Sequence, residues 1–358
     1  MILDFMGKKL LIAGGGTGGH IFPGIAIAEE WRRLGGDVVF VGTPQGQEGR
    51  LVPKYGFELK LLKVGSLKGA GFIKKIKTLA GLPGALLASY KILKNEKPNV
   101  VLGIGGYASG PLCFAAALSG KKTAITDQNV HPGITNRILG KIVDQIFLSF
   151  AASLAFFSPR KVLVTGNPVR SQITATPYQT PKDELHLFIF GGSQGAVTLN
   201  ENVTKAIDLI KDLWPKLKIT HQAGKTDLES LTDFYKSRGL NATVSCFFDD
   251  MNTLYKEAHV VICRSGAGTM TELALAGRPA IFVPYPFAAD NHQAKNAALF
   301  VSEGAAWMIE QKDLNPEWLA EKFCSFLKDP AELVQKASAM QKLAKPEAAQ
   351  MIVKELMA

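Results

Sequence analysis

The residues best suited to chemistry lie between positions 263 and 297. A run of small residues, 265–269 (SGAGT), follows the apolar segment 260–263 and precedes good helix formers that end at Gly277. The pattern predicts a strand, a tight turn and the start of a helix. Such a turn brings free backbone N–H groups and the positive end of the helix dipole together, which suits phosphate oxygens.

Side chains of the same stretch extend this chemistry. Arg264 adds a fixed positive charge suited to a bidentate phosphate contact, and Glu272 can accept hydrogen bonds from ribose hydroxyls. Four hydrogen-bonding residues follow at 290–293 (DNHQ). One short stretch thus contains groups that can bind phosphate, ribose and sugar hydroxyls. This predicts a site for a nucleotide sugar.

This pattern resembles the donor-binding signature of nucleotide-sugar glycosyltransferases with two Rossmann-like domains. It is most similar to the MurG family, the N-acetylglucosaminyltransferases that convert lipid I to lipid II in peptidoglycan synthesis. Four further motifs, described below, spread the resemblance over nearly the whole chain. The resemblance implies an α/β, GT-B type fold with parallel sheets facing a cleft. We expect an N-terminal domain at 1–166, a C-terminal domain at 167–339, and a last helix at about 340–358 that returns to the first domain.

Composition bounds the class of protein. A chain of 358 residues suits two domains, and 47% hydrophobic with 20% charged residues is typical of globular proteins. The four cysteines are scattered, which favours reduced cytosolic residues over a metal site. No signal peptide or membrane span is expected. The net charge of +10 indicates a polyanionic partner, either nucleic acid or an anionic membrane.

The first glycine loop, 14–20 (GGGTGGH), lies between a predicted strand at 8–13 and a predicted helix at 23–34. Its GxGxxG match also fits a dinucleotide site, but that site needs an acid at the end of the second strand, and Asp37 stands at its start. We therefore favour the sugar site over NAD. By resemblance, Thr17, Gly18 and Gly19 bind the donor, and the acceptor lies near His20.

His20 is our first candidate for the general base, because it closes a glycine loop at the carboxyl end of a strand, where α/β proteins bind ligands. A capping or structural role is the alternative. The second glycine loop, 103–111, resembles the family loop that faces the acceptor diphosphate, through Gly105, Gly106 and Tyr107. Asn129 is assigned to the acceptor side and, with Asp127, to orienting the hydroxyl. The family usually has Glu at position 127, so the shorter Asp127 leaves a direct catalytic role open.

The segment 59–95 carries eight lysines and no acid. Phe72, Ile73, Ile76 and Leu79 recur at helical spacing, with Lys74 and Lys75 mostly on another face. A basic amphipathic helix can lie in an anionic membrane surface, whereas the alternative is a helix whose apolar stripe is core. The segment lacks the aromatic interleaving of a single-strand nucleic-acid platform. We predict peripheral binding to the cytoplasmic face of an anionic membrane, and no nucleic-acid partner.

The remaining motifs belong to the donor side. TGNPVR at 165–170 resembles a family motif whose arginine, here Arg170, approaches the donor diphosphate, and GGSQGA at 191–196 offers Ser193 and Gln194. By resemblance the Phe248 backbone pairs with uracil, and Ala267, Gly268 and Thr269 line the donor, although the family has a larger apolar residue at 268. His292 and Gln293 would contact the sugar. Asp249 and Asp250 lack the Asp-x-Asp spacing of metal-dependent transferases, so no metal or cofactor is expected.

The resemblance implies an inverting transferase that moves N-acetylglucosamine from UDP-N-acetylglucosamine to the 4-hydroxyl of the muramyl sugar of lipid I, an undecaprenyl diphosphate-linked muramyl peptide. Helix dipoles and Arg264 would stabilise the leaving phosphate in place of a metal. Two alternatives remain. One is a UDP-N-acetylglucosamine 2-epimerase, or another UDP-sugar transferase, of the same fold. The other is a non-enzymatic nucleotide-binding membrane adaptor.

Overall fold

A computed structural model describes residues 6–44, 46–64, 72–192 and 195–358, and for residues 72–80 it describes the backbone alone. The chain forms two compact units. Unit 1 comprises residues 1–171 and 345–358, and unit 2 comprises residues 172–344. The sequence placed these boundaries at 166/167 and 339/340.

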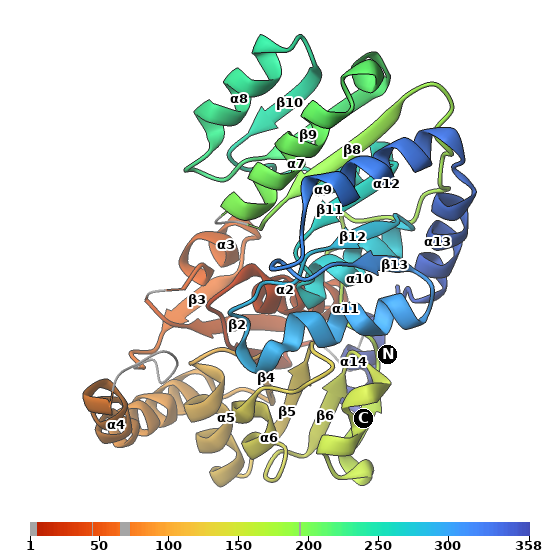
Figure 1. Ribbon diagram of the computed structural model, residues 1–358. Helices are drawn as coiled ribbons and strands as arrows, with labels where there is room; N and C mark the ends of the chain where they lie inside the picture. Colours follow the sequence, from red (N-terminus) through yellow and green to blue (C-terminus); the bar gives the residue numbers. More distant parts are fainter. Residues whose placement is uncertain (1–5, 45, 65–71, 193–194) are drawn as a thin grey trace. The chain divides into compact units, whose positions relative to one another are not determined.

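Unit 1 is built on a seven-stranded sheet in the order β3-β2-β1-β4-β5-β6-β7 (Figure 1). The strands are β1 (Lys9–Ala13), β2 (Asp37–Gly42), β3 (Glu58–Leu61), β4 (Val100–Gly103), β5 (Lys122–Asp127), β6 (Gln145–Leu148) and β7 (Val162–Val164). Every pairing in it is parallel. The strand order reverses between β1 and β4, and ligands of open parallel sheets bind at the carboxyl ends of strands at such a point.

Helices cover both faces of this sheet. They are α2 (Gly18–Arg33), α3 (Glu48–Lys54), α4 (Phe72–Glu96), α5 (Ser109–Leu118), α6 (Ile134–Leu139) and α14 (Ala348–Met357). Alternate residues of β1 separate the two cores. Leu10 and Ile12 pack in the cluster that contains α2 and α14, while Leu11 and Ala13 pack in the cluster that contains α5. Both faces of the strand are therefore apolar, as parallel sheets require.

The last helix, α14, belongs to unit 1 although unit 2 precedes it in the chain. Ile352, Val353 and Leu356 are at most 1% exposed and lie in the same core cluster as Ile25 and Trp31 of α2. Among the residues that the structure describes, no helix is long and apolar enough to cross a membrane.

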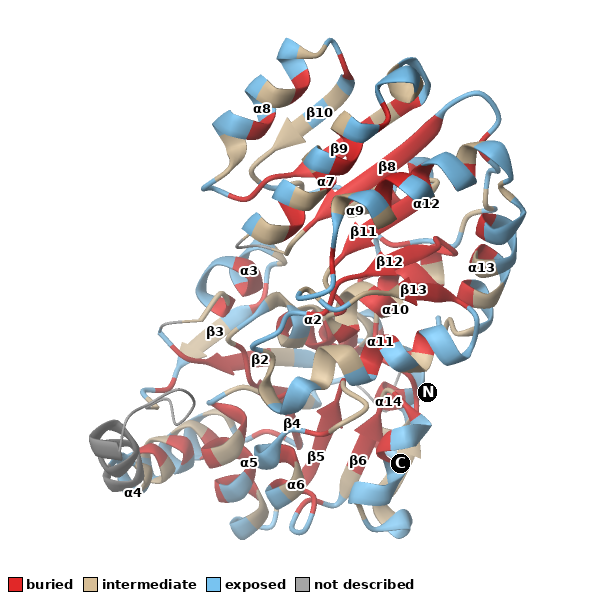
Figure 2. Ribbon diagram, viewed as in Figure 1, coloured by how far each residue is buried: buried red, intermediate tan, exposed pale blue. Residues whose placement is uncertain are grey.

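Unit 2 contains a six-stranded sheet in the order β10-β9-β8-β11-β12-β13, again with parallel pairings throughout. The strands are β8 (Leu185–Phe190), β9 (Leu217–Gln222), β10 (Asn241–Ser245), β11 (Val260–Cys263), β12 (Ala280–Phe282) and β13 (Ala306–Met308). Its order reverses between β8 and β11. Figure 2 shows the central strands of both sheets as mostly buried, which confirms the predicted α/β class with parallel sheets.

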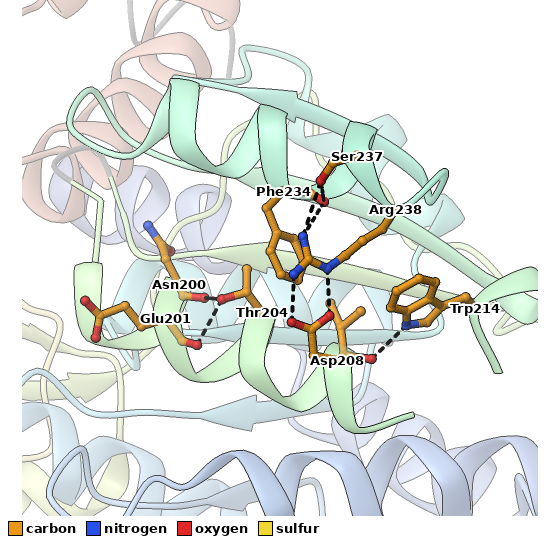
Figure 3. A network of polar contacts seen from close by, with 9 residues as sticks. Asn200, Glu201, Thr204, Asp208, Trp214, Phe234, Ser237 and Arg238 are labelled. Atoms are coloured by element: carbon orange, nitrogen blue, oxygen red, sulfur yellow. Dashed lines mark hydrogen bonds and ion pairs between the residues drawn. The ribbon is translucent and has the colours of Figure 1, made fainter. Parts of the chain in front are cut away.

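The helices of unit 2 are α7 (Val197–Leu209), α8 (Leu228–Ser237), α9 (Met251–Glu257), α10 (Ala267–Ala276), α11 (His292–Ser302), α12 (Pro316–Lys328) and α13 (Ala331–Lys342). A polar network joins α7 to the end of α8 (Figure 3). The Arg238 guanidinium donates to both Asp208 carboxylate oxygens at 2.7 and 2.9 Å, and its Cζ lies 3.8 Å from the centre of the Phe234 ring. This network holds α8 against α7.

Two helices begin earlier than the sequence predicts. The helix expected to start at Pro23 starts at Gly18, and the helix expected from Met270 starts at Ala267. In both places the small residues expected to form a turn make the first helical turn instead. This is possible because the N–H groups of a first turn need no partner within the helix, and Pro23 costs one hydrogen bond of the second turn.

Three histidines are held neutral inside unit 2. Burial lowers the pKa of His221 to about 3, and burial likewise lowers the pKa values of His186 and His259 to about 4. His221 lies between the Tyr235 hydroxyl, 2.8 Å from its Nδ1, and the Asn200 amide oxygen, 3.1 Å from its Nε2. The His186 backbone N–H donates to His259 Nδ1 at 2.8 Å, which requires that nitrogen to carry no proton.

We predict that unit 2 loses stability as the pH falls from about 6.5, the usual histidine pKa, towards the lowered values. In that pH range the histidines bind protons in the unfolded chain and stay neutral in the folded protein, so the free energy of unfolding decreases as the pH is lowered. The loss at pH 5 should be about 2 kcal/mol for the fully buried His221, and smaller for His186 and His259, which solvent partly screens. Thermal unfolding at pH 8 and pH 5 measures it. His221→Gln, which removes one titratable ring, should reduce the pH dependence, and an unchanged dependence would contradict this account.

Candidate functional site

The two glycine loops of unit 1 meet through their main chains. They follow β1 and β4, the neighbouring strands at which the strand order reverses. The Gly15 N–H donates to the Gly105 carbonyl at 3.2 Å. Gly106 has φ +82°, and a Cβ there would lie 2.9 Å from the Gly15 nitrogen. Only glycine permits this approach, because any side chain would separate the loops.

A buried carboxylate supports the first loop. Glu48 is 1% exposed, and its oxygens accept hydrogen bonds from the Gly16 N–H at 2.8 Å, the Thr43 N–H at 2.6 Å and the Thr43 hydroxyl at 2.9 Å. A side chain at Gly15 would collide with this carboxylate. A dinucleotide site needs an acid at the end of β2. Glu48 stands six residues beyond the last residue of that strand, Gly42, and the sequence did not indicate its role. Its carboxylate binds the chain's own loops.

His20 lies in the first turn of α2, partly buried beside the second glycine loop. Its Nδ1 is 3.1 Å from the Gln128 amide oxygen. A Cβ built on Gly105 would lie 2.8 Å from the same nitrogen, so the loop packs closely on this edge of the ring. Sequence reasoning missed Gln128, although the residue stands between two that were named, because its contact with His20 spans 108 positions.

Asp127 and Asn129 follow β5 in the same region. Asp127 is 2% exposed, and its carboxylate accepts hydrogen bonds from the backbone N–H groups of Asn129 and Gly133 and from the Asn136 amide, at 3.0, 3.3 and 2.8 Å. These bonds favour a role in holding the loop that carries Asn129. The Asn129 carbonyl accepts from the Ser153 hydroxyl at 2.8 Å.

The remaining predicted residues of unit 1 lie around the start of α2 and after β4. Thr17 is the N-cap of α2 and makes no side-chain capping bond, while Gly18 and Gly19 form the first turn, which contains no acid. Free N–H groups at such a helix start suit an anion. The Arg170 guanidinium stacks on the Phe22 ring of α2, 4.3 Å from its centre. Tyr107 follows the second loop and is 39% exposed.

Unit 2 repeats the arrangement at its own reversal of strand order. Gly266 is the N-cap of α10, and Ala267, Gly268 and Thr269 form the first turn without a side-chain cap or an acid. This places the helix start directly after β11, as the predicted phosphate site requires. The predicted donor residues Ser193 and Gln194 lie outside the described residues.

Arg264 lies beside this helix start and is engaged by its own unit. Its Nη1 donates to the Val283 and Pro284 carbonyls at 3.1 Å each, and its Nη2 donates to the Gln311 amide oxygen at 2.6 Å. Burial lowers the pKa of the guanidinium below its usual range. Arg264 therefore anchors the turn after β12, and a phosphate contact remains a prediction for it.

Phe248 and Glu272 also have partners within unit 2. The Phe248 N–H donates to the Gln222 amide oxygen at 3.1 Å, and the Gln222 amide donates to the Gly192 carbonyl at 3.0 Å. Gln222 thus links the glycine loop after β8 to Phe248. Glu272 is 7% exposed and accepts from the Tyr255 hydroxyl at 3.0 Å. It lies in the second turn of α10, since the helix begins at Ala267.

His292 and Gln293 are the first two residues of α11, and the two residues before them have a strained backbone. Asp290 and Asn291 both have φ +52°, which non-glycine residues rarely adopt and which costs free energy that the surrounding structure must supply. The Gln293 amide oxygen accepts from the Tyr285 N–H at 2.9 Å, and its carbonyl accepts from the Ser265 hydroxyl at 2.9 Å. His292 Nδ1 lies 2.8 Å from the Ala289 carbonyl. These contacts hold the 284–293 segment against the turn between β11 and α10.

Asp250, the second residue of the aspartate pair, has a structural role. Asp250 caps α9, accepting from the Thr253 N–H at 3.1 Å and from its hydroxyl at 2.7 Å. The hydrogen bond from the Thr253 side chain lowers the pKa of this carboxyl. The cap accounts for the residue without a bound ion.

We predict that Glu48→Ala destabilises unit 1 by about 3 kcal/mol or more, because three buried donors lose their acceptor. Chemical and thermal unfolding measure the change. Glu58→Ala is the matched control, since that carboxylate is exposed and its loss should cost at most about 0.5 kcal/mol. Equal stability of the two variants would show that the carboxylate does not support the loop.

Comparison with known proteins agrees with this arrangement. The N-terminal domain model of glycosyltransferase family 28 matches residues 10–148, and the C-terminal domain model of the same family matches residues 186–352. The fold, the loops at both reversal points and these matches define a GT-B type glycosyltransferase.

Individual relatives narrow the class. A UDP-N-acetylglucosamine–N-acetylmuramyl-(pentapeptide) pyrophosphoryl-undecaprenol N-acetylglucosamine transferase of Myxococcus xanthus is 45% identical over 345 residues, covering 95% of this chain and 90% of its own. The enzyme of the same name from Geobacter sulfurreducens is 43% identical over 357 residues and 98% of both chains. The crystal structure of Acinetobacter baumannii MurG superposes with a TM-score of 0.80 and 31% identity, covering 98% of this chain and 99% of its own. The chain belongs to the MurG family.

A UDP-N-acetylglucosamine 2-epimerase of Neisseria meningitidis, solved with its nucleotide sugar, shares the fold with a TM-score of 0.67. It is 14% identical and covers 98% of this chain and 99% of its own. At that identity the likeness concerns the fold alone.

Proposed function

We propose that the chain transfers N-acetylglucosamine from UDP-N-acetylglucosamine to the 4-hydroxyl of the muramyl sugar of lipid I and so forms lipid II. The carrying observation is the identity of 43–45% over more than nine-tenths of the chain with relatives that bear this name. The site geometry supports it, since both units place a glycine loop and a helix start at the reversal of strand order.

Unit 2 binds the donor in this proposal. The diphosphate meets the first turn of α10 at Ala267, Gly268 and Thr269, where N–H groups and the helix dipole stabilise the charge that grows as UDP leaves. Gln222 holds Phe248 for the uracil. Because the Phe248 N–H is bound to Gln222, its carbonyl is the group that accepts from the base.

The sugar and ribose meet the other side of the same helix start. Gln293, Tyr285 and Ser265 are joined by hydrogen bonds, so the segment that carries His292 and Gln293 is fixed relative to α10. Arg264 acts through the turn that it anchors at Val283 and Pro284. Glu272 receives ribose hydroxyls from the second turn of α10.

Unit 1 binds the acceptor. Its diphosphate lies against Gly105, Gly106 and Tyr107, while Asn129, on the loop held by Asp127, orients the muramyl sugar. His20 takes the proton of the 4-hydroxyl, and that oxygen attacks the anomeric carbon from the face opposite UDP. The bond between this carbon and the UDP oxygen breaks, UDP leaves with the electron pair, and the configuration inverts.

We predict that the full chain forms labelled disaccharide lipid from radiolabelled UDP-N-acetylglucosamine and a short-chain lipid I analogue. His20→Ala should lower kcat by about 10²–10⁴-fold, the usual contribution of a positioned base, because no group then takes the proton. UDP affinity, measured by calorimetry, should not change, since the His20 side chain is assigned to the acceptor and not to the donor.

Tight UDP binding without transfer would overturn the acceptor half of the proposal. The same mixture is then examined for epimerised UDP-N-acetylglucosamine, which would identify a 2-epimerase. Binding with neither reaction would leave the adaptor alternative.

We also propose that unit 1 binds the cytoplasmic face of an anionic membrane, where the polyprenyl acceptor resides. The predicted membrane residues Phe72, Ile73, Lys74, Lys75, Ile76 and Leu79 lie outside the described side chains. Further along α4, Leu87 and Tyr90 are 66% and 55% exposed, and Leu118 on the neighbouring α5 is 75% exposed. Figure 1 shows α4, α5 and α6 side by side in unit 1.

The exposed apolar row continues on α6. Ile134 and Ile138 lie four residues apart on α6 and are 65% and 59% exposed, and Ile142, which follows the helix, is 39% exposed. The exposed Lys141 stands beside them, and the exposed Lys91 and Lys94 stand near the end of α4. Apolar side chains with lysines at their border suit the interface of an anionic bilayer.

We predict that the double variant Lys74→Glu, Lys75→Glu weakens binding to vesicles of phosphatidylglycerol and phosphatidylethanolamine by about 30-fold, because each lysine near an anionic surface contributes about 1 kcal/mol. Vesicle co-sedimentation measures it. The control, Lys225→Glu with Lys236→Glu, changes the net charge equally on exposed positions of unit 2. Equal loss in both variants would argue against a specific membrane face.

A further inference from the structure

We propose that Gln128 is a positioning residue that holds the His20 ring in the tautomer with the proton on Nδ1, so that Nε2 is the nitrogen that removes the acceptor proton. This inference rests on the proposed function for its kinetic consequence. The tautomer itself is a property of the free protein.

Gln128 is buried and reaches three partners from the end of β5. It is 3% exposed. Its amide nitrogen donates to the Thr126 hydroxyl oxygen at 2.8 Å and to the Ile104 carbonyl at 3.3 Å. Its amide oxygen lies 3.1 Å from His20 Nδ1. The amide therefore spans from β5 to the chain after β4 and on to α2.

The orientation of the amide follows from one partner. A backbone carbonyl can only accept, so the group that faces the Ile104 oxygen must be the NH₂. The opposite orientation would bring two acceptor oxygens together in a buried place and leave the NH₂ directed at the histidine. The Gln128 oxygen therefore faces His20, and an amide oxygen can only accept.

The orientation of the Gln128 amide determines which nitrogen of the His20 imidazole carries the proton. With an acceptor at 3.1 Å, Nδ1 must carry the hydrogen. In the neutral ring one nitrogen is protonated and the other has the lone pair, so Nε2 has the lone pair. A flipped ring would place a carbon in the position of Nδ1 and lose the hydrogen bond to Gln128, so the observed ring orientation is favoured. A base that accepts a proton at Nε2 needs this tautomer.

A merely structural role for Gln128 makes a different prediction. If the amide only joined β5, β4 and α2, its loss would reduce stability and leave the tautomer of His20 as it is in the wild type. Thr126→Val is the matched control for this possibility. It removes one partner of the buried amide and keeps the Ile104 carbonyl that orients it, so thermal stability should fall while the proton stays on Nδ1.

The direct test is nitrogen NMR of the full chain labelled with ¹⁵N-histidine, at a pH where the ring is neutral. The His20 signals are those that disappear in His20→Ala. Long-range proton correlations should show a protonated Nδ1 and an unprotonated Nε2 in the wild type and in Thr126→Val. In Gln128→Met, which has similar volume and no acceptor, the two tautomers should mix.

The kinetic test follows the same variants in the transfer assay. Gln128→Met should lower kcat by about tenfold, the equivalent of one hydrogen bond between neutral groups. KM for UDP-N-acetylglucosamine should stay unchanged, because neither Gln128 nor the His20 ring is assigned to the donor. This split separates loss of the base from loss of fold, which would lower the amount of active protein and UDP binding together.

Three results would overturn the inference: a wild-type ring protonated on Nε2, a Gln128→Met ring that stays fully protonated on Nδ1, or a Gln128→Met variant with wild-type kcat. The NMR result is independent of the acceptor. A chain that fails to use lipid I would refute the proposed function and still report the tautomer.

Discussion

The contact between the main chains of two glycine loops is the constraint on which unit 1 depends. β1 and β4 are neighbours in the sheet, so the loops that follow them emerge together, and Gly15 and Gly106 allow them to touch. The acceptor residues Gly105 and Gly106, and His20 beside them, are positioned by this contact. Glu48 accepts a hydrogen bond from Gly16 of the first loop, and the His20 ring packs against Gly105 of the second. A side chain on either glycine would therefore displace the histidine as well as the loop.

Most of the fold could be predicted from the sequence because its signals are local. Short apolar runs before glycine loops marked β1, β4, β8 and β11, and alternation with helical segments required parallel sheets. The starts of α2 and α10 were misplaced because glycine is read as a turn residue. In a first helical turn its small size is tolerated, and the uncapped N–H groups there are the useful feature.

The site could be predicted only in part. Residue types and motifs located the loops, but the partners that give each side chain its role are distant in sequence. Gln128 reaches His20 across 108 positions, and Arg264 reaches Gln311 across 47. Arg264 was expected to contact phosphate, and the structure adds its bonds to two carbonyls and an amide, which the sequence did not indicate. Buried amides and carboxylates that orient other residues carry no spacing signal, so the roles of Gln128 and Glu48 emerged only from the structure.

The place of α14 has a consequence for how the chain is made. Unit 2 is inserted between the body of unit 1 and the ten-residue helix whose Ile352, Val353 and Leu356 complete the unit 1 core. On the ribosome, unit 2 is finished before unit 1, although unit 1 is begun first. Until the last residues leave the exit tunnel, the apolar face of α2 lacks its cover. The nascent chain therefore carries an open hydrophobic surface through the whole synthesis of unit 2, until α14 has left the exit tunnel.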